Sequence, residues 1–248
     1  MIVKNFLAAN PFFDAYIHSD LLGKLIFIGL VILSIATWVI LIHKVWLTFQ
    51  ARKKSAQFFQ TFQHHKNSPL NLECDPSGLR KTPNPFLTLY LVLKKHTIDI
   101  LNKNRRFGQQ NGDSNHISYL SPSDVDFVEA HLMTTVASQT KNLEKNLFIL
   151  STITSLAPFL GLLGTVWGIL TTFSELQAQS SGSTHQMVLG GLSLALATTV
   201  LGLIDAIPAL IGYNYLKNAI RDFETEMEGF ANEILASVEM QYRKVDVR

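Results

Sequence analysis

Asp205 is the residue whose chemistry most needs an explanation, because it lies inside the apolar run 187–213, MVLGGLSLALATTVLGLIDAIPALIGY. A charged side chain within a bilayer is costly, so an ionisable residue there marks a functional site by default. A carboxyl group in such a low-dielectric setting resists ionisation, which predicts a neutral resting form and only a transient charge. The alternative is a structural carboxyl that ties two helices together through a hydrogen bond.

Hydroxyl side chains form a second feature, in the uncharged run 148–173. At about 100° per residue, four of its hydroxyl residues fall within about 60° of one another, with a proline in line. They are Ser151, Thr154, Thr165 and Thr172, with Pro158. One face of this helix therefore favours protein or water over lipid.

A proton path can be built from these groups, because a hydroxyl both donates and accepts a hydrogen bond. Thr165 of the run 148–173, and Thr198 and Thr199 of the run 187–213, are predicted to line this path with Asp205. Each proton that crosses would release about 2.3 kcal/mol per 100 mV of membrane potential.

Small residues indicate where the helices approach one another. Gly164 and Gly168 have the GxxxG spacing that allows close helix contact, and Gly202 shares a face with Asp205 at about 100° per residue. The residues assigned to helix packing are Gly164, Gly168, Gly191, Gly202, Pro158 and Pro208.

Three runs are long enough to cross a bilayer as helices, which takes roughly 20 apolar residues. They are 25–42, 148–173 and 187–213, in a chain that is 47% hydrophobic and 16% charged. The sequence therefore predicts an all-α membrane protein with three transmembrane helices, of which the second and third extend into the cytoplasm as long rods.

Lys and Arg residues set the expected orientation, since they concentrate on the cytoplasmic side. Arg52, Lys53 and Lys54 follow the first run, and no Lys or Arg occurs between the second and third runs, which predicts N-out and C-in. The expected segments are an external amphipathic segment 1–20, span 21–43, cytoplasmic loop 44–120 with short helices, cytoplasmic-to-membrane helix 121–174, external loop 175–186, span 187–213 and cytoplasmic helix 214–248.

The helices outside the membrane have their own signals. Ser121, Pro122 and Asp124 predict a helix start, with a cap, a proline in the first turn and an acidic residue there. No proline or glycine follows before Pro158, which predicts one rod into the membrane. A short helix is expected near 86–101. The tail is expected to be amphipathic, with apolar residues at Phe223, Met227, Phe230, Ile234, Leu235 and Val238.

Several chemistries lack their residues. Cys74 is the one cysteine, which excludes an internal disulfide, and adjacent His64 and His65 cannot share a helix face to hold a metal. An intramembrane aspartic protease would need a second acid facing Asp205, and no P-loop, GxGxxG or HExxH motif occurs. We therefore expect neither an enzyme nor a cofactor or metal.

Three motifs resemble one family. GLLGTVWGI at 161–169, GLSLALATT at 191–199 and GLIDAIPALIGYNY at 202–215 are similar to the MotA/TolQ/ExbB proton-channel family, and to its TolQ/ExbB branch above all. The resemblance implies a homo-pentamer in the bacterial inner membrane. Its second and third helices would line a pore around a TolR- or ExbD-like single-span partner that supplies an essential aspartate, with a TolA- or TonB-like third component.

Carried over to this chain, the family's two pore threonines fall on Thr165 and Thr199. The family's third-helix glutamate falls on Leu194, which is a departure. Asp205 lies about 16 Å further along that helix at about 1.5 Å per residue. Either the acid has moved along the path, or this chain relies on its partner's carboxylate.

Two functions remain open at this point. The first is a proton-channel subunit that drives outer-membrane or envelope work, with a Tol-Pal type favoured over a TonB type because the N-terminal segment is short. The rival is a membrane scaffold around a partner helix without a proton relay of its own, since Leu194 removes the expected acid.

Overall fold

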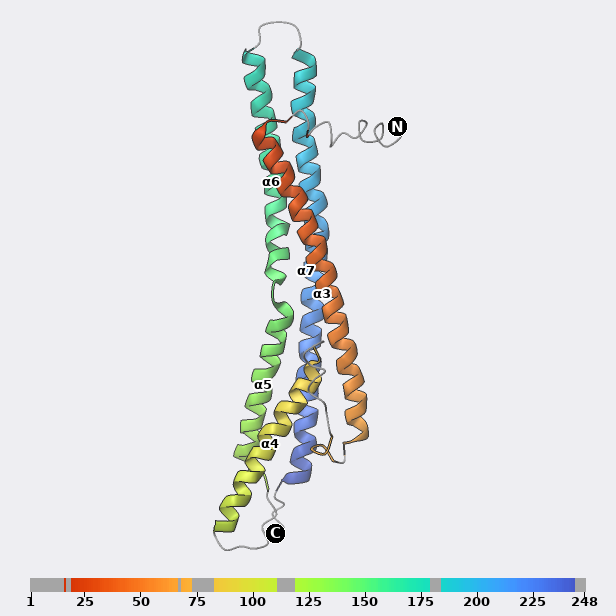
Figure 1. Ribbon diagram of the computed structural model, residues 1–248, viewed down its shortest axis with the longest axis vertical. Coiled ribbons are helices and arrows are strands. Elements are labelled where there is room, and N and C mark those ends of the chain that lie inside the picture. The colour runs from red at the N-terminus through yellow and green to blue at the C-terminus, as the bar shows by residue number, and fades with distance from the viewer. Residues whose placement is uncertain are drawn as a thin grey trace. The chain divides into compact units, whose positions relative to one another are not determined.

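The computed structural model describes Tyr16 and residues 19–66, 68–72, 83–110, 119–178 and 184–243. The predicted all-α class is confirmed for these residues. The helices, drawn in Figure 1, are α3 (Leu21–His64), α4 (Pro85–Gln110), α5 (Pro122–Glu144), α6 (Leu147–Ala178) and α7 (Thr184–Tyr242). Of the external segment expected at 1–20, the described residues include Tyr16, Ser19 and Asp20.

Helices α3, α6 and α7 are each long and apolar enough to cross a membrane. The chain divides into two compact units. We call residues 1–43 and 146–216 the membrane unit, because they hold the apolar parts of these three helices, and residues 44–145 and 217–248 the extramembrane unit.

Helix α3 does not end where its apolar run ends. The expected loop from residue 44 is wrong at its start, because α3 continues without a break to His64. Between Lys44 and His64 the chain has no proline or glycine to stop a helix, so the Lys and Arg residues there mark the end of the apolar run and not the end of the helix.

Helix α4 is also longer than the expected 86–101, since it runs to Gln110. The stretch 101–110 was expected to be a loop because it is rich in Asn, Gly and Arg. Tertiary hydrogen bonds act against that preference: the Asn104 side-chain amide donates to the Tyr119 carbonyl at 3.1 Å and to the Asp124 carboxylate at 3.2 Å.

The predicted helix start at Ser121 is confirmed as a capping box. The Ser121 hydroxyl accepts from the Asp124 backbone N–H at 3.3 Å, and the Asp124 carboxylate accepts from the Ser121 N–H at 3.0 Å. The expected unbroken rod 121–174 is wrong, however. Helix α5 ends at Glu144 and α6 starts at Leu147, because Asn146 adopts a φ of 67°. Asparagine tolerates this left-handed conformation, which ends a helix.

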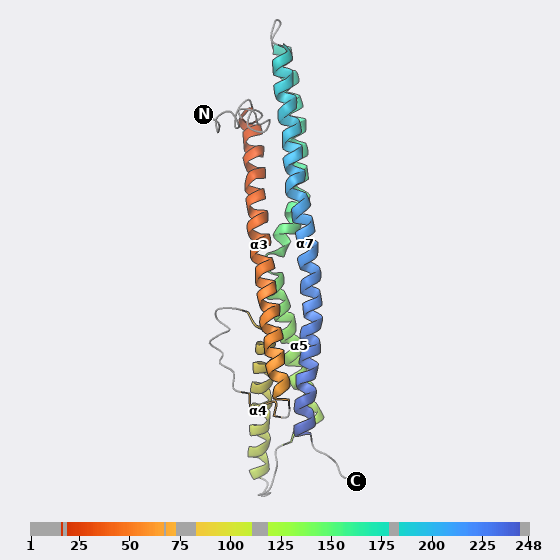
Figure 2. The ribbon, with the colours of Figure 1, turned by 90° about the vertical axis from the view of Figure 1, so that its right-hand side faces the viewer.

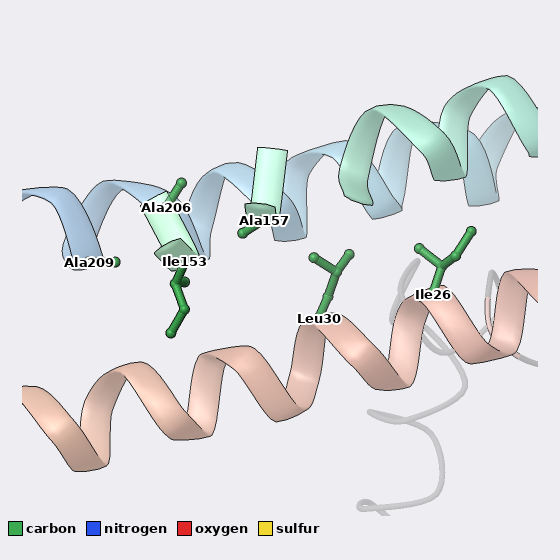
Figure 3. Packing of buried hydrophobic residues seen from close by; sticks show 6 residues of the cluster. All are labelled: Ile26, Leu30, Ile153, Ala157, Ala206 and Ala209. Atoms are coloured by element: carbon green, nitrogen blue, oxygen red, sulfur yellow. The ribbon is translucent and has the colours of Figure 1, made fainter. Parts of the chain in front are cut away.

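The core of the membrane unit is made by all three membrane helices. Figure 3 shows two residues from each: Ile26 and Leu30 of α3, Ile153 and Ala157 of α6, and Ala206 and Ala209 of α7. The alanines of α7 let larger side chains of α3 and α6 fill the space between the helices. Helix α7 itself is continuous for 59 residues through Pro208.

The core of the extramembrane unit is aromatic. The ring of Phe230 on α7 stacks on Phe86 of α4 with centroids 4.3 Å apart, and Phe58, Phe59 and Phe62 of α3 meet Phe230 edge-on or nearly so. The predicted amphipathic pattern of the tail is confirmed, since Phe223, Met227, Phe230, Ile234, Leu235 and Val238 are all buried.

Candidate functional site

A seam of small residues joins α6 to α7 in the membrane unit, where the two helices run side by side (Figure 1). A Cβ added at Gly164 would lie 2.6 Å from the Cβ of Thr198, and one added at Gly202 would lie 2.6 Å from the carbonyl oxygen of Ala157. Gly168 faces the Gly191 carbonyl, 3.0 Å from where its Cβ would be. Real Cβ atoms do not approach other atoms as closely as at Gly164 and Gly202, so these two positions require glycine for the helices to pack as they do, while a side chain at Gly168 would need its neighbour to shift.

Thr198 and Thr199 lie on this seam, and their hydroxyls point at α6. The Thr198 hydroxyl donates to the Ala195 carbonyl at 2.9 Å, with a longer 3.5 Å approach to the Gly161 carbonyl. The Thr199 hydroxyl donates to the Gly161 carbonyl at 3.2 Å. Both threonines therefore hydrogen-bond to backbone oxygens at the α6–α7 contact.

Thr165 lies beside the seam and is half-buried. Its hydroxyl donates to the Leu162 carbonyl within its own helix at 2.7 Å, which leaves the oxygen's lone pairs free to accept from another molecule. Ser151, Thr154 and Pro158 are likewise half-buried, whereas Thr172 at the far end of the stripe is buried and donates to the Gly168 carbonyl. The hydroxyl stripe thus runs along the border of the α6–α7 contact.

Asp205 lies about two turns beyond Thr198 on the same face of α7. Its side chain is 4% exposed, and the hydroxyl of Ser34 on α3 hydrogen-bonds its carboxyl group. Its Oδ2 atom is buried with no hydrogen-bond partner among the described residues. A buried oxygen without a partner is costly, and a proton on that oxygen would remove most of the cost.

The structure therefore separates the residues that the sequence assigned to one path. Thr199 bonds to α6, Thr198 bonds to Ala195 within α7, and Asp205 bonds to α3. Ser34 was not predicted, although a hydroxyl within the apolar run 25–42 was a visible signal. Leu194, the position of the expected glutamate, lies in α7.

Asp20 is a second carboxylate that sequence reasoning missed. It lies directly before α3, where its Oδ1 accepts from the Gly23 N–H at 2.9 Å and caps the helix. Its Oδ2 accepts from the indole Nε1–H of Trp167 on α6 at 2.7 Å. Asp20 thus connects the start of α3 to the GTVWG motif.

No group of three or more His, Cys, Asp or Glu side chains within the described ranges could hold a metal ion. The ring of His65, which directly follows α3, hydrogen-bonds the Thr61 carbonyl of that helix at 3.0 Å. Cys74 lies outside the described residues.

The glycine seam, the threonines and the carboxyl group lie in the part of the chain that matches a known family. The model of the MotA/TolQ/ExbB proton channel family matches residues 103–229 of the 248. The chain belongs to this family. Its membership makes the chain a membrane protein of the proton-channel type, with transmembrane helices.

Named relatives come from both arms of the TolQ/ExbB branch. A biopolymer transport protein ExbB of Pseudomonas putida is 28% identical over 223 residues, which cover 90% of this chain and 62% of the relative. A Tol-Pal system protein TolQ of Haemophilus influenzae is 26% identical over 237 residues, or 93% of this chain and 94% of the relative. An ExbB of Aquifex aeolicus is 43% identical over 99 residues, which cover 40% of this chain and 66% of the relative. This chain thus spans less than two thirds of the Pseudomonas putida and Aquifex aeolicus relatives.

Proposed function

We propose that this chain is the proton-conducting subunit of a TolQ/ExbB-type motor in the bacterial inner membrane. It would couple the proton-motive force to a TolR- or ExbD-like single-span partner, and through a TolA- or TonB-like third component to work at the outer membrane or envelope. The buried carboxyl of Asp205 inside an apolar span carries this proposal, because an ionisable group there is costly and marks a functional site by default.

The route of the proton follows from the contacts of Asp205. A neutral Asp205 would release its proton toward the cytoplasm, and the resulting carboxylate would then take up a new proton from the side of the partner, with Ser34 hydrogen-bonding whichever form is present. In this route Asp205 takes the place of the glutamate that the family pattern would have at Leu194. Charge need exist on the carboxyl only during transfer.

The threonines divide into two roles in this proposal. Thr165 is half-exposed and offers its oxygen to a helix or water outside the subunit, so it would line the pore and face the partner's aspartate. Thr199 bonds to the Gly161 carbonyl of α6 and Thr198 to the Ala195 carbonyl of α7, and both would join the proton path only when these bonds open.

Assembly into a ring, five subunits by family resemblance, would cover surface that a single subunit exposes. Large apolar side chains point outward beside Thr165, among them Leu162 and Val166, which are 57% and 59% exposed. Lipid suits these apolar groups but not the hydroxyl stripe next to them, which favours contact with a neighbouring subunit or with the partner. A well-behaved monomer in detergent that forms no ring on addition of partner would contradict this assembly.

The orientation in this proposal is N-out and C-in, because Arg52, Lys53 and Lys54 follow the first span. Cys74 should then be shielded from a membrane-impermeant thiol reagent in intact cells whose outer membrane has been permeabilised. Rapid labelling of Cys74 would reverse the topology.

The test of function is proton flux. The chain would be reconstituted in liposomes with its TolR- or ExbD-like partner, a membrane potential imposed, and internal acidification followed with a pH-sensitive dye. Flux that depends on Asp205 supports a channel. A complex that assembles fully but conducts no more than empty liposomes supports the scaffold alternative instead.

Within this proposal we favour the Tol-Pal arm; relatives named TolQ and ExbB both align with at least 90% of this chain. Co-purification separates the two arms, since a TolR-like protein would be recovered with the chain in one case and an ExbD-like protein in the other.

A further inference from the structure

Lys44 is a buried lysine on α3. It is the first residue of that helix that belongs to the extramembrane unit. Its residue is 5% exposed, and its Nζ donates a hydrogen bond of 2.9 Å to the carbonyl oxygen of Leu143. Leu143 is in the last turn of α5, where carbonyl groups lack a partner within the helix. Lys44 therefore caps the C-terminus of α5 from another helix.

The electrostatic setting of Lys44 favours loss of its proton. Burial lowers the pKa of the Lys44 ammonium below the usual lysine range, and the positive charge of Lys145 lowers it further. The C-terminal end of α5 opposes these two effects on the Lys44 ammonium, because a helix C-terminus stabilises a nearby cation. Lys145 is the one ionisable side chain whose charge moves this pKa among the described residues.

Two buried hydroxyls lie one turn from the Lys44–Leu143 contact. Thr48 follows Lys44 by four residues on α3, and Thr140 precedes Leu143 by three on α5, so each shares a face with the contact residue of its helix. Helices α3 and α5 run in opposite directions (Figure 2), which places both threonines on the same side of the contact.

These hydroxyls have no partner in the described structure. Thr48 is 6% exposed and Thr140 is 7% exposed, and the Oγ1 atom of each is buried without a hydrogen bond. Buried hydroxyls in native proteins almost always bond to protein or to ordered water. An ammonium with two further N–H donors and two hydroxyls provides the polar partners that a small group of buried waters requires.

Lys44 also continues a polar stripe along α3. Ser34, the partner of Asp205, is followed at spacings of three to seven by Thr37, Lys44 and Thr48, and Thr37 is 1% exposed. At about 1.5 Å per residue, Lys44 lies about 15 Å along the helix from Ser34. These side chains lie on one side of α3, with no residue of the stripe between Thr37 and Lys44.

We propose that Lys44, with Thr48, Thr140 and the waters they hold, is the proton-release site of this subunit. This inference rests on the proposed function and adds the group that passes each proton to the cytoplasm. The Lys44 amine accepts a proton from a water on its membrane side and becomes an ammonium. It then gives a proton to a water beside Thr48 and Thr140 and returns to the neutral amine, so that one proton enters and one leaves.

A purely structural cap is the competing role for Lys44, and two substitutions separate the two roles. Lys44→Arg keeps a permanent positive charge that can donate to the Leu143 carbonyl, but arginine does not release its proton in proteins. Lys44→Met removes both the charge and the donor while preserving an unbranched apolar stem. Lys53→Arg, on the exposed part of α3, is the matched control.

Proton flux would be measured in liposomes that hold the chain with its TolR- or ExbD-like partner. We expect both Lys44 variants to reduce flux at least tenfold, with the Arg variant as stable to heat as the wild type and the Lys53→Arg control unchanged. Wild-type flux in Lys44→Arg would overturn the inference while leaving the proposed function intact. A wild-type complex that conducts no protons would overturn the proposed function and this inference with it.

A second readout does not depend on conduction. The Lys44 amine would be titrated by NMR in the full-length wild-type chain in detergent, with lysine labelled at Nζ and Lys44→Arg used to assign its signal. We expect a midpoint below the ordinary lysine value of about 10.4. A midpoint at or above that value would overturn the proposal, because the ammonium would then hold its proton throughout.

Discussion

The indole Nε1–H of Trp167 donates a hydrogen bond to Oδ2 of Asp20 at 2.7 Å, which ties the residue before α3 to the middle of α6. The other carboxylate oxygen caps α3 through Gly23. One aspartate therefore starts the first membrane helix and holds it against the second.

Replacing Trp167 by Phe should weaken this tie. The ring keeps most of its apolar contact area but loses the N–H, and a hydrogen bond to a partly exposed carboxylate contributes about 1 kcal/mol. Thermal unfolding in detergent should show a lower midpoint for Trp167→Phe. Phe159→Leu, on an exposed position of the same helix, is the control that should change little. Equal midpoints for Trp167→Phe and the wild type would show that the bond does not contribute.

Asp205→Asn should abolish proton flux, because the amide retains a hydrogen bond to Ser34 but does not exchange a proton. Ser34→Ala should reduce flux by about fivefold, the equivalent of one hydrogen bond of about 1 kcal/mol. Both are measured in liposomes with the partner present. Wild-type flux in Asp205→Asn would contradict a proton role for this carboxyl, and rescue of Asp205→Ala by Leu194→Glu would support the idea that the acid has moved along the helix.

Gly164→Ala should destabilise the α6–α7 contact, since the new methyl group would lie 2.6 Å from the Cβ of Thr198. Overpacking of this kind costs about 1–3 kcal/mol, more than the roughly 1 kcal/mol that alanine gains over glycine in a helix. Gly29→Ala on α3 is the matched control, because nothing lies within 4 Å of its new Cβ. Resistance to unfolding in detergent should fall for Gly164→Ala and stay equal or rise for Gly29→Ala. The reverse order would contradict a close α6–α7 contact at Gly164.

The capping box of α5 should make stability depend on pH at the acid end. Desolvation by itself would raise the pKa of Asp124, but hydrogen bonds from the Ser121 backbone and side chain and from Asn104, with the charge of Lys103, hold that pKa below its usual value. This carboxylate therefore adds stability above the unfolded-state pKa of about 3.9, and the contribution is lost as the pH falls through the lower folded-state pKa.

Ser121→Ala tests this cap, because it removes a side-chain partner of Asp124 and should cost about 1 kcal/mol near neutral pH. Unfolding curves at pH 7 and at pH 2.5 would be compared. The difference between variant and wild type should be smaller at the lower pH. A difference that does not change with pH would show that Asp124 does not act through its charge.

The ring of His96 on α4 lies 4.3 Å from that of His131 on α5, measured between ring centroids. Burial, His131 and Lys95 lower the pKa of His96, and Asp99 opposes them. When folding lowers the pKa of a histidine, the residue contributes its full stability above its unfolded-state pKa of about 6.5. This contribution is lost as the pH falls through the unfolded-state pKa toward the folded-state pKa.

Stability of the chain should therefore decrease between about pH 7 and pH 5, and His96→Phe, which keeps an aromatic ring beside His131, should flatten that part of the profile. Chemical unfolding in detergent across this range checks the prediction. His64→Phe on α3 is the control, and a profile that His96→Phe leaves unchanged would assign the pH dependence to another group.

The sequence predicted those features that depend on local pattern. Hydropathy located the three membrane helices, the Ser121–Pro122–Asp124 signal located the start of α5, and apolar spacing identified the buried face of the tail. Each of these is determined by residues within one or two turns of one another.

Features that depend on contacts between distant residues were missed. The loop expected at 101–110 is helical because Asn104 bonds to residues 15 and 20 positions away. The partner of Asp205 is a serine on α3, and helical periodicity along α7 shows which residues share a face without showing which helix that face meets. The single residue with a positive φ outside glycine, within the described chain, is Asn146, and nothing in its neighbours' propensities signalled the break.

The break at Asn146 gives the two long helical paths different mechanical properties. Between Glu144 and Leu147 the ladder of backbone hydrogen bonds is interrupted, so α6 can turn about its own axis without winding or unwinding α5. Helix α7 has no such break, since it stays helical from Thr184 to Tyr242 through the apolar span and the acidic tail, with a backbone bond missing only where Pro208 lacks an N–H. Torsion applied to α7 near Asp205 would therefore be carried by its backbone, whereas torsion applied to α6 near Thr165 would be released at Asn146.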